Sequence, residues 1–282
     1  MRVNRFDSIS QSYERAQGYL LQREAYHALI LGLIDAVSKS PNRFTHPPYF
    51  ATVEADETTL AVALQTPPRK LLLSQVVCPE AVEVIAFDFY QTQQLPLAGV
   101  IGPTIAAYTF AQTWVHSHRS SLPKSNDTAF FFQVDGVRFF PQVSGHLQLA
   151  SHAEQQRLES WCQELIAEAL DERKKGDAKS LIERFLHQQR LYTWQDRVPV
   201  SIVHVARFTP NGVGISGVYT PPPYRSKGYA SACVAALSQS LLNLGYKSCF
   251  LITDLSNPTS NQIYQKIGYQ PVGDACDYWF ED

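Results

Sequence analysis

The stretch from residue 218 to residue 231 carries the residue types that bind a phosphate group. An apolar strand ends there, because the three prolines that follow it can neither continue a strand ladder nor lie inside a helix. Gly228 then permits a tight turn, and the small residues after it let several main-chain N–H groups point into one concavity. A helix begins at this point, so a pyrophosphate would be stabilised at its positive end. Arg225 and Lys227 add positive charge at the rim.

A second polar segment follows one helix and one strand later. Asn257-Pro258 marks a turn, and a short helix comes directly after it. Asn261 and Tyr264 are three residues apart on that helix, so they lie on one face. We therefore expect both side chains to face the same site.

The elements around these segments follow a simple order. A strand runs to Tyr219, a helix spans residues 231–244 and ends at Gly245, and a second strand spans residues 248–254. Gly268 ends the second helix, and a third strand begins there. This strand-helix-strand-helix-strand order predicts a mixed α/β unit with right-handed crossovers.

The two segments resemble motifs A and B of the GNAT superfamily of acyltransferases. Motif A has the pattern Gln/Arg-x-x-Gly-x-Gly/Ala, which Arg225, Gly228 and Ala230 match. The resemblance covers about residues 144–282 and implies that the loop holds the pyrophosphate of acetyl-coenzyme A. A loop that merely starts a helix is the alternative. The residues that the resemblance assigns to this donor are Val218, Thr220, Arg225, Ser226, Lys227, Gly228, Tyr229, Ala230, Ser231, Asn257 and Asn261.

The resemblance also implies a catalytic role for Tyr264, whose hydroxyl would protonate the departing coenzyme A thiolate; a core aromatic is the alternative. Superfamily members often carry a Glu on the strand before the loop or on an adjacent one, but residues 213–219 contain no carboxylate. The base that accepts a proton from the amine is therefore unassigned. Asp254 better suits a turn cap, and His204 better suits a core position. The candidates are Asp196, His204, Asp254 and Asp277.

The first half of the chain repeats the strand and helix order of the second half. We expect an N-terminal α/β domain over residues 1–143, interpreted as a non-catalytic GNAT-like copy, and a GNAT domain over residues 144–282. Residues 65–68 echo residues 219–222, but no Arg-x-x-Gly-x-Ala loop follows them, which predicts no second donor site. This half would complete a substrate cleft, form an interface, or serve as a scaffold without a ligand. A homodimer stays open. The predicted fold class is α/β (α+β) with a mixed sheet.

Two details of the first half are also predicted. The apolar spacing over residues 12–37 predicts a single helix. Asp135-Gly136 predicts a hairpin between strands over residues 129–134 and 137–143.

The composition is that of a soluble globular protein with two domains. The chain has 282 residues, of which 45% are hydrophobic and 18% charged, and its net charge is −2. This charge gives no global attraction to nucleic acid or to an anionic membrane. No apolar run reaches the ~20 residues of a membrane helix, and the N-terminus does not resemble a signal peptide, so we expect a cytoplasmic protein.

The cysteines do not predict a disulfide framework or a metal site. The five of them are spread out and form no Cys-x-x-Cys pair. The His116-x-His118 pair has no further ligands near it in the sequence, and residues two apart do not share a helix face. We therefore expect no metal.

Together these observations predict an N-acetyltransferase that moves an acetyl group from acetyl-coenzyme A to a primary amine of unknown identity by direct attack in a ternary complex. A longer acyl donor stays open. The alternatives are a regulatory module that binds acyl-coenzyme A without chemistry, and a purely structural or partner-binding protein.

Overall fold

The computed structural model describes residues 1–6, 8–40, 44, 46–92, 96–118, 128–168 and 177–280. The chain divides into two compact units. Unit 1 comprises Met1–Phe132, Ile252–Pro258 and Pro271–Asp282, and unit 2 comprises Gln133–Leu251 and Thr259–Gln270. The domain boundary between residues 143 and 144 stays a prediction.

Both halves of the chain share one order of elements: a strand, two helices, three strands, a helix, a strand, a helix and a strand. In the first half these are β1 (Arg2–Arg5), α1 (Ile9–Leu20), α2 (Ala28–Lys39), β2 (Tyr49–Ala55), β3 (Thr58–Gln65), β4 (Leu71–Leu73), α3 (Pro79–Thr92), β5 (Gly99–Gly102), α4 (Thr104–His118) and β6 (Thr128–Val134). In the second half they are β7 (His146–Leu149), α5 (Gln155–Glu168), α6 (Ala178–His187), β8 (Leu191–Asp196), β9 (Val198–Phe208), β10 (Gly212–Tyr219), α7 (Tyr229–Asn243), β11 (Ser248–Asp254), α8 (Pro258–Ile267) and β12 (Gln270–Trp279). The predicted repeat is therefore present in the fold.

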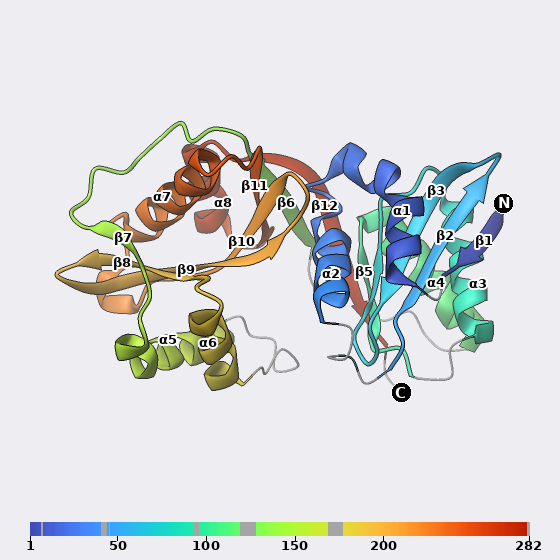
Figure 1. Ribbon diagram of the computed structural model, residues 1–282, viewed down its shortest axis with the longest axis horizontal. Coiled ribbons are helices and arrows are strands. Elements are labelled where there is room, and N and C mark those ends of the chain that lie inside the picture. Colours follow the sequence, from blue (N-terminus) through green and yellow to red (C-terminus); the bar gives the residue numbers. More distant parts are fainter. Residues whose placement is uncertain are drawn as a thin grey trace. The chain divides into compact units, whose positions relative to one another are not determined.

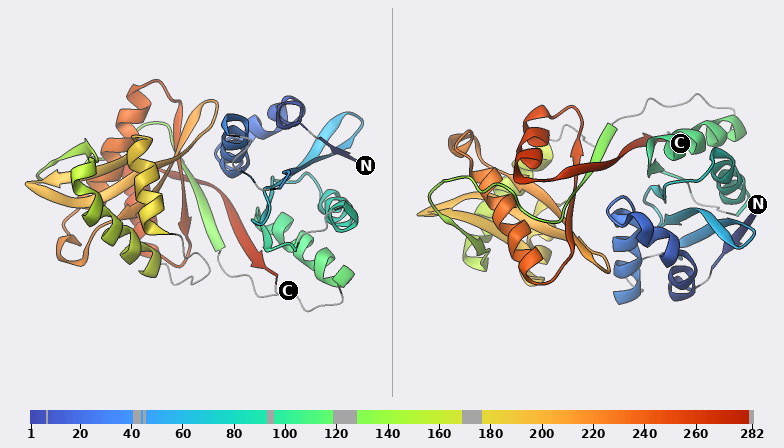
Figure 2. Two further views of the ribbon diagram at one scale, coloured as in Figure 1. Left: turned by 60° about the horizontal axis from the view of Figure 1, so that its bottom comes forward. Right: turned by 90° about the horizontal axis from the view of Figure 1, so that it is seen from above.

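The sheet of unit 1 has the strand order β1-β2-β3-β4-β5-β12-β6. Its first four strands are antiparallel, β4 and β5 are parallel, and β12 runs antiparallel to β5. Successive residues of β2 point to opposite faces, as the pleat requires. Phe50 packs with α1 and α2, whereas Val53 packs with α3 and α4, so the two helix pairs cover opposite faces (Figures 1 and 2). The last strand of the second repeat thus completes the sheet of unit 1.

The single helix predicted over residues 12–37 is wrong, because the chain turns between α1 and α2. Buried His27 holds this turn through both ring nitrogens. Nε2 accepts a hydrogen bond from the backbone N–H of Gln75 at 3.1 Å, so the proton lies on Nδ1, which is 2.8 Å from the carbonyl oxygen of Leu20. Burial lowers the pKa of His27 to about 4, and the ring is neutral at neutral pH.

The sheet of unit 2 has the strand order β7-β8-β9-β10-β11. All neighbours are antiparallel except β10 and β11, which are parallel and pair from Gly212–Ser248 to Gly214–Phe250. Helices α5 and α6 pack on one face through Leu158 and Ile182. Helix α7 lies on the other face (Figure 1). Beyond Gly214 the strand β10 has irregular register with β9, and Gly217 has a left-handed φ of 62°.

The strand predicted over residues 137–143 is also wrong, although its expected partner exists as β6. The N–H of Arg138 donates to the carbonyl of Ile267 at 2.8 Å, and the N–H of Val143 donates to that of Pro141 at 3.0 Å. Proline cannot donate to a ladder, which disfavours a strand here. This segment instead passes close to Gly228, where an added Cβ would lie 3.0 Å from Val143 Cγ1.

Candidate functional site

The loop after β10 has the geometry of an anion cradle. A 3-10 turn at Pro222–Tyr224 ends the strand, and Ser226 and Gly228 then adopt left-handed φ values of 60° and 86°. Gly228 is the N-cap of the 15-residue α7 and makes no side-chain cap hydrogen bond. The first N–H groups of a helix have no acceptor within the helix. The start of α7 therefore presents backbone donors at the positive end of the helix dipole.

The two cations predicted at the rim of the loop also hold the loop in shape. Arg225 donates through Nε to the carbonyl of Thr220 at 2.8 Å and through Nη2 to Glu168 of α5 at 2.5 Å. Lys227 donates to the carbonyl of Pro223 at 3.1 Å. Both side chains are exposed, so the ion pair with Glu168 adds little stability but fixes the direction of the guanidinium.

Asp196, one of the four candidate bases, anchors the start of α7. Its Oδ2 accepts from the Tyr229 hydroxyl at 2.5 Å and from Ser144 Oγ at 2.8 Å. These hydrogen bonds, that of Tyr229 first, hold the pKa of Asp196 below its usual range. A carboxylate with a lowered pKa is a weak proton acceptor, so the structure gives Asp196 a positioning role.

Tyr264 lies partly buried on α8, where its ring packs edge-on against buried Tyr269 with centroids 6.1 Å apart. Burial raises the pKa of Tyr264 to about 12, so its hydroxyl keeps its proton at neutral pH. Asn261 lies one turn earlier on the same helix. Unit 2 contains Tyr264 and all of the predicted donor residues except Asn257, which belongs to unit 1.

Two further candidate bases are engaged elsewhere in the structure. Asp254 accepts from the N–H of Ser256 at 2.7 Å and caps the turn, as its sequence context indicates. Asp277 is buried in unit 1, where Lys70 donates to its Oδ2 and places its ammonium 3.5 Å from the centre of the Trp279 ring.

His204, the fourth candidate, lies beside the irregular part of β10. Its ring stacks on Phe185 of α6 with centroids 4.1 Å apart. An added Cβ on Gly217 would lie 2.3 Å from His204 Nδ1, so the glycine makes room for the imidazole. Burial, followed by the charges of three arginines of which Arg207 contributes most, lowers the pKa of His204 to about 4. The ring is therefore neutral at neutral pH.

Comparison with known proteins bears on the fold. Residues 200–279 match the family model described as FR47-like protein. A Drosophila protein aligns over 99% of this chain and 98% of its own at 13% identity, with a TM-score of 0.70. An acetyltransferase of the GNAT family from Colwellia psychrerythraea covers both chains fully at 9% identity, with a TM-score of 0.60. A tandem GNAT protein from the clavulanic acid biosynthesis pathway also covers both fully at 9% identity, with a TM-score of 0.55.

The chain has the GNAT fold. This confirms the predicted resemblance and fold class, including the second GNAT-like half. No curated protein matches the sequence.

The repeated order of elements shows which part of the first repeat corresponds to the loop after β10. That part is the connector from β4 to α3, because both connectors follow the third strand of a meander. Its backbone is used internally: the N–H of Ser74 bonds to the carbonyl of Val62 at 2.9 Å, and that of Val77 to the carbonyl of Leu60 at 3.0 Å. The sequence echo at residues 65–68 lies one strand earlier, after β3, so it is not structurally equivalent to residues 219–222.

Two searches of the part of the chain that the structure describes were negative. No helix there has the length and apolar character needed to cross a bilayer. No three His, Cys, Asp or Glu side chains there gather into a group that could hold a metal ion.

Proposed function

We propose that this protein is an N-acyltransferase that moves the acetyl group of acetyl-coenzyme A to a primary amine by direct attack in a ternary complex. The observation that carries the proposal is the loop after β10, where left-handed Gly228 precedes the uncapped start of α7. A pyrophosphate fits such a cradle because backbone N–H groups and the helix dipole both favour an anion there. GNAT acetyltransferases among the structural neighbours support the reaction class.

The donor would lie along unit 2 from the loop toward the middle of β10. The loop from Arg225 to Ser231 would hold the pyrophosphate mainly through its backbone, since the Arg225 guanidinium is engaged by Glu168. Main-chain groups of Val218 and Thr220 would contact the pantetheine and the thioester. Asn261 would contact the pantetheine arm. No metal takes part in this proposal.

The chemistry needs one bond made and one broken. The amine nitrogen attacks the thioester carbonyl carbon, the C–S bond breaks with its electron pair left on sulfur, and the proton that the nitrogen loses on becoming an amide passes to water. Tyr264 would give its proton to this thiolate and regain one from water; burial raises its pKa to about 12, so the hydroxyl carries that proton at neutral pH. Three candidate bases are engaged by neighbours and His204 has a lowered pKa, so the acceptor would enter as the neutral amine.

Replacement of Tyr264 by Phe tests the catalytic step. We expect Tyr264→Phe to lower kcat roughly 100-fold, the usual scale of a general acid, while the Kd for acetyl-coenzyme A changes little. Tyr246→Phe is the matched control, because Tyr246 stacks on Phe208 and stands outside the proposed site. Release of coenzyme A during incubation with amines gives the rates. Equal turnover of Tyr264→Phe and the native protein would remove Tyr264 from the mechanism.

The second candidate function is a regulatory module that binds acyl-coenzyme A without chemistry. The observation that favours it is the absence of a carboxylate from residues 213–219. A panel of primary amines separates the two functions. Acetyl-coenzyme A binding with no coenzyme A release for any amine would support the module, and release with at least one amine would support the enzyme.

A further inference from the structure

Three arginines lie near enough to His204 of β9 for their charges to act on its ring, which stacks on Phe185 of α6. Arg184 lies with its guanidinium carbon 5.2 Å from the centre of the Phe185 ring, the same ring that stacks on His204. Arg190 lies with its guanidinium carbon 4.7 Å from the ring of Phe208 at the end of β9. We call this group the basic cluster: Arg184, Arg190, His204 and Arg207. The charges that lower the pKa of His204 are those of Arg207, Arg184 and Arg190, in that order.

Arg207 is the arginine of the basic cluster whose positive charge is least neutralised by neighbouring groups. It lies opposite Gly214 of β10, where an added Cβ would fall 2.7 Å from Arg207 Cγ, so the glycine makes room for the side chain. Among the described residues, no hydrogen-bond or ion-pair partner of its guanidinium is found. Burial lowers the pKa of Arg207 to about 10, which still leaves it charged at neutral pH. Arg207 is half-buried, and a partly desolvated charge without a counter-ion favours an anion.

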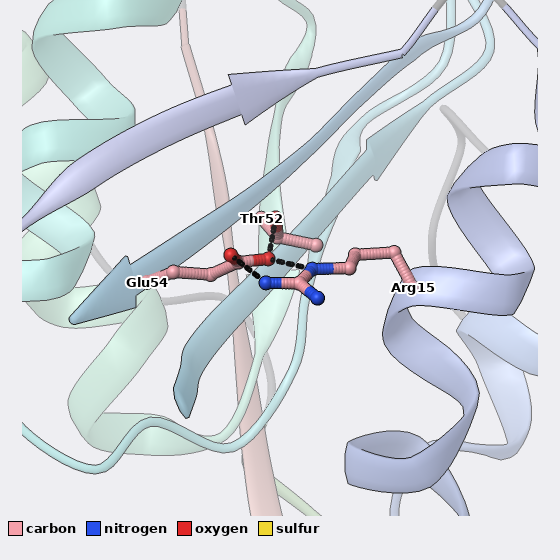
Figure 3. Close-up of polar contacts among 3 residues, drawn as sticks. All are labelled: Arg15, Thr52 and Glu54. Carbon is pink, nitrogen blue, oxygen red and sulfur yellow. Dashed lines mark hydrogen bonds and ion pairs between the residues drawn. The ribbon is translucent and has the colours of Figure 1, made fainter. Parts of the chain in front are cut away.

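In unit 1, a guanidinium that stabilises the fold is neutralised by a carboxylate of the same chain. Arg15 of α1 donates to both carboxylate oxygens of buried Glu54, at 2.8 and 2.5 Å, and Thr52 donates to the same carboxylate at 2.9 Å (Figure 3). This bidentate pair is complete within the chain. In the part of the chain that the structure describes, no carboxylate pairs with Arg207 in this way, so we expect its counter-ion to come from a bound molecule.

We propose that the basic cluster binds the anionic group of the acceptor, so that the acceptor is a primary amine carrying a carboxylate or a phosphate. This inference rests on the proposed function. Gly214 lies five residues before Tyr219, about 17 Å along an extended strand, so the basic cluster and the phosphate loop lie at opposite ends of β10. Irregular Gly217 and His204 lie between them. The phosphates of the donor occupy the loop, and the anion at Arg207 belongs to the second substrate.

Matched pairs of acceptors test the proposal. Glycine is compared with glycinamide and phosphoethanolamine with ethanolamine, using native protein, Arg207→Gln and the control Arg157→Gln, whose arginine is exposed on α5. In the native protein we expect kcat/KM to be at least tenfold higher for the anionic member of one pair than for its neutral member. The pair that shows this preference identifies the anionic group as carboxylate or phosphate. Arg207→Gln should reduce this ratio at least tenfold with an unchanged Kd for acetyl-coenzyme A, and Arg157→Gln should preserve the ratio. A native preference for neutral amines, or an unchanged ratio in Arg207→Gln, would overturn the proposal.

A binding measurement separates this inference from the proposed function. Inorganic phosphate is titrated into the full chain with excess acetyl-coenzyme A, and the melting temperature is followed. We expect phosphate to raise it in the native protein and in Arg157→Gln, but not in Arg207→Gln. Equal shifts in all three proteins would overturn the anion site. A shift that depends on Arg207 without acetylation of any amine would overturn the acyltransfer reaction and leave the anion site standing.

Discussion

The two repeats differ most at the connector that follows the third strand of each meander. In the second repeat, left-handed Gly228 turns the chain into α7, and no side chain caps the first N–H groups of that helix. In the first repeat, the connector continues alongside β3, its N–H groups bond to β3 carbonyls, and α3 begins with Pro79 and Glu80. A carboxylate in the first turn disfavours a second anion there. One fold thus leaves backbone donors available for an anion in the second repeat and uses them internally in the first.

His27 contributes to this difference between the repeats, because its neutral ring accepts a hydrogen bond from Gln75 in the connector of the first repeat. The pKa of His27 is about 4 in the folded protein and about 6.5 in an unfolded chain, so the unfolded chain binds the extra proton. Its stabilising contribution is complete above pH 6.5 and is lost as pH falls toward 4, a change of about 3 kcal/mol. We expect urea unfolding at pH 7 and pH 4.5 to show this loss.

The variant His27→Gln isolates this effect, because an amide can donate and accept hydrogen bonds but does not titrate in this range. The pH dependence that remains in the variant includes His204, whose pKa is also about 4. A variant with the same pH dependence as the native protein would show that His27 does not lock the first connector.

The ion pair of unit 1 gives the next largest effect. Arg15→Gln leaves buried Glu54 without its bidentate partner, and we expect a loss in the free energy of unfolding that is clearly larger than that of an exposed arginine. Half-exposed Arg15 limits the loss, since water screens part of the interaction. Denaturant unfolding measures it, with Arg157→Gln as the control. A loss no larger than that of the control would contradict a structural role for this pair.

Ser231→Glu would give the second repeat the acidic helix start of the first. Because Ser231 lies in the first turn of α7, a carboxylate there should stabilise the helix and repel a pyrophosphate. We expect the affinity for acetyl-coenzyme A to fall about tenfold, or about 1.4 kcal/mol, with unchanged or slightly higher stability. Ser231→Gln, which adds similar bulk without charge, is the control. Equal affinities of the two variants would argue against an anion at this helix start.

The smallest expected effect concerns Arg207. Replacing a half-buried cation that has no carboxylate partner among the described residues removes an unfavourable charge, so Arg207→Gln should leave the free energy of unfolding unchanged or raise it slightly. Arg15→Gln should lower the free energy of unfolding. The two variants therefore compare a guanidinium proposed to bind a ligand with one that stabilises the fold. Denaturant unfolding of both variants measures the contrast. A loss of stability in Arg207→Gln as large as that in Arg15→Gln would assign Arg207 to the fold.

Local chemistry in the sequence was enough to predict the turn and helix start after β10, the helix α8 and the repeated order of elements. The phosphate-binding role of the loop after β10 stays a prediction. The prolines and Gly228 act on their immediate neighbours, and the spacing of Asn261 and Tyr264 is a helical period. The features that the sequence did not reveal depend on distant partners. β12 pairs with β5, far away in the chain, and His27 reaches Gln75 across the fold. The basic cluster joins residues whose spacing has no helix or strand period, so only the structure brings them together.

The number of donor sites tests the central comparison most directly. Acetyl-coenzyme A is titrated by calorimetry into native protein, Gly228→Asp and Gly136→Asp, the last at a glycine with open space around it. Circular dichroism checks that each protein is folded. We predict one site per chain in the native protein and in Gly136→Asp, and none in folded Gly228→Asp. Two sites per chain, or binding retained in Gly228→Asp, would contradict the account.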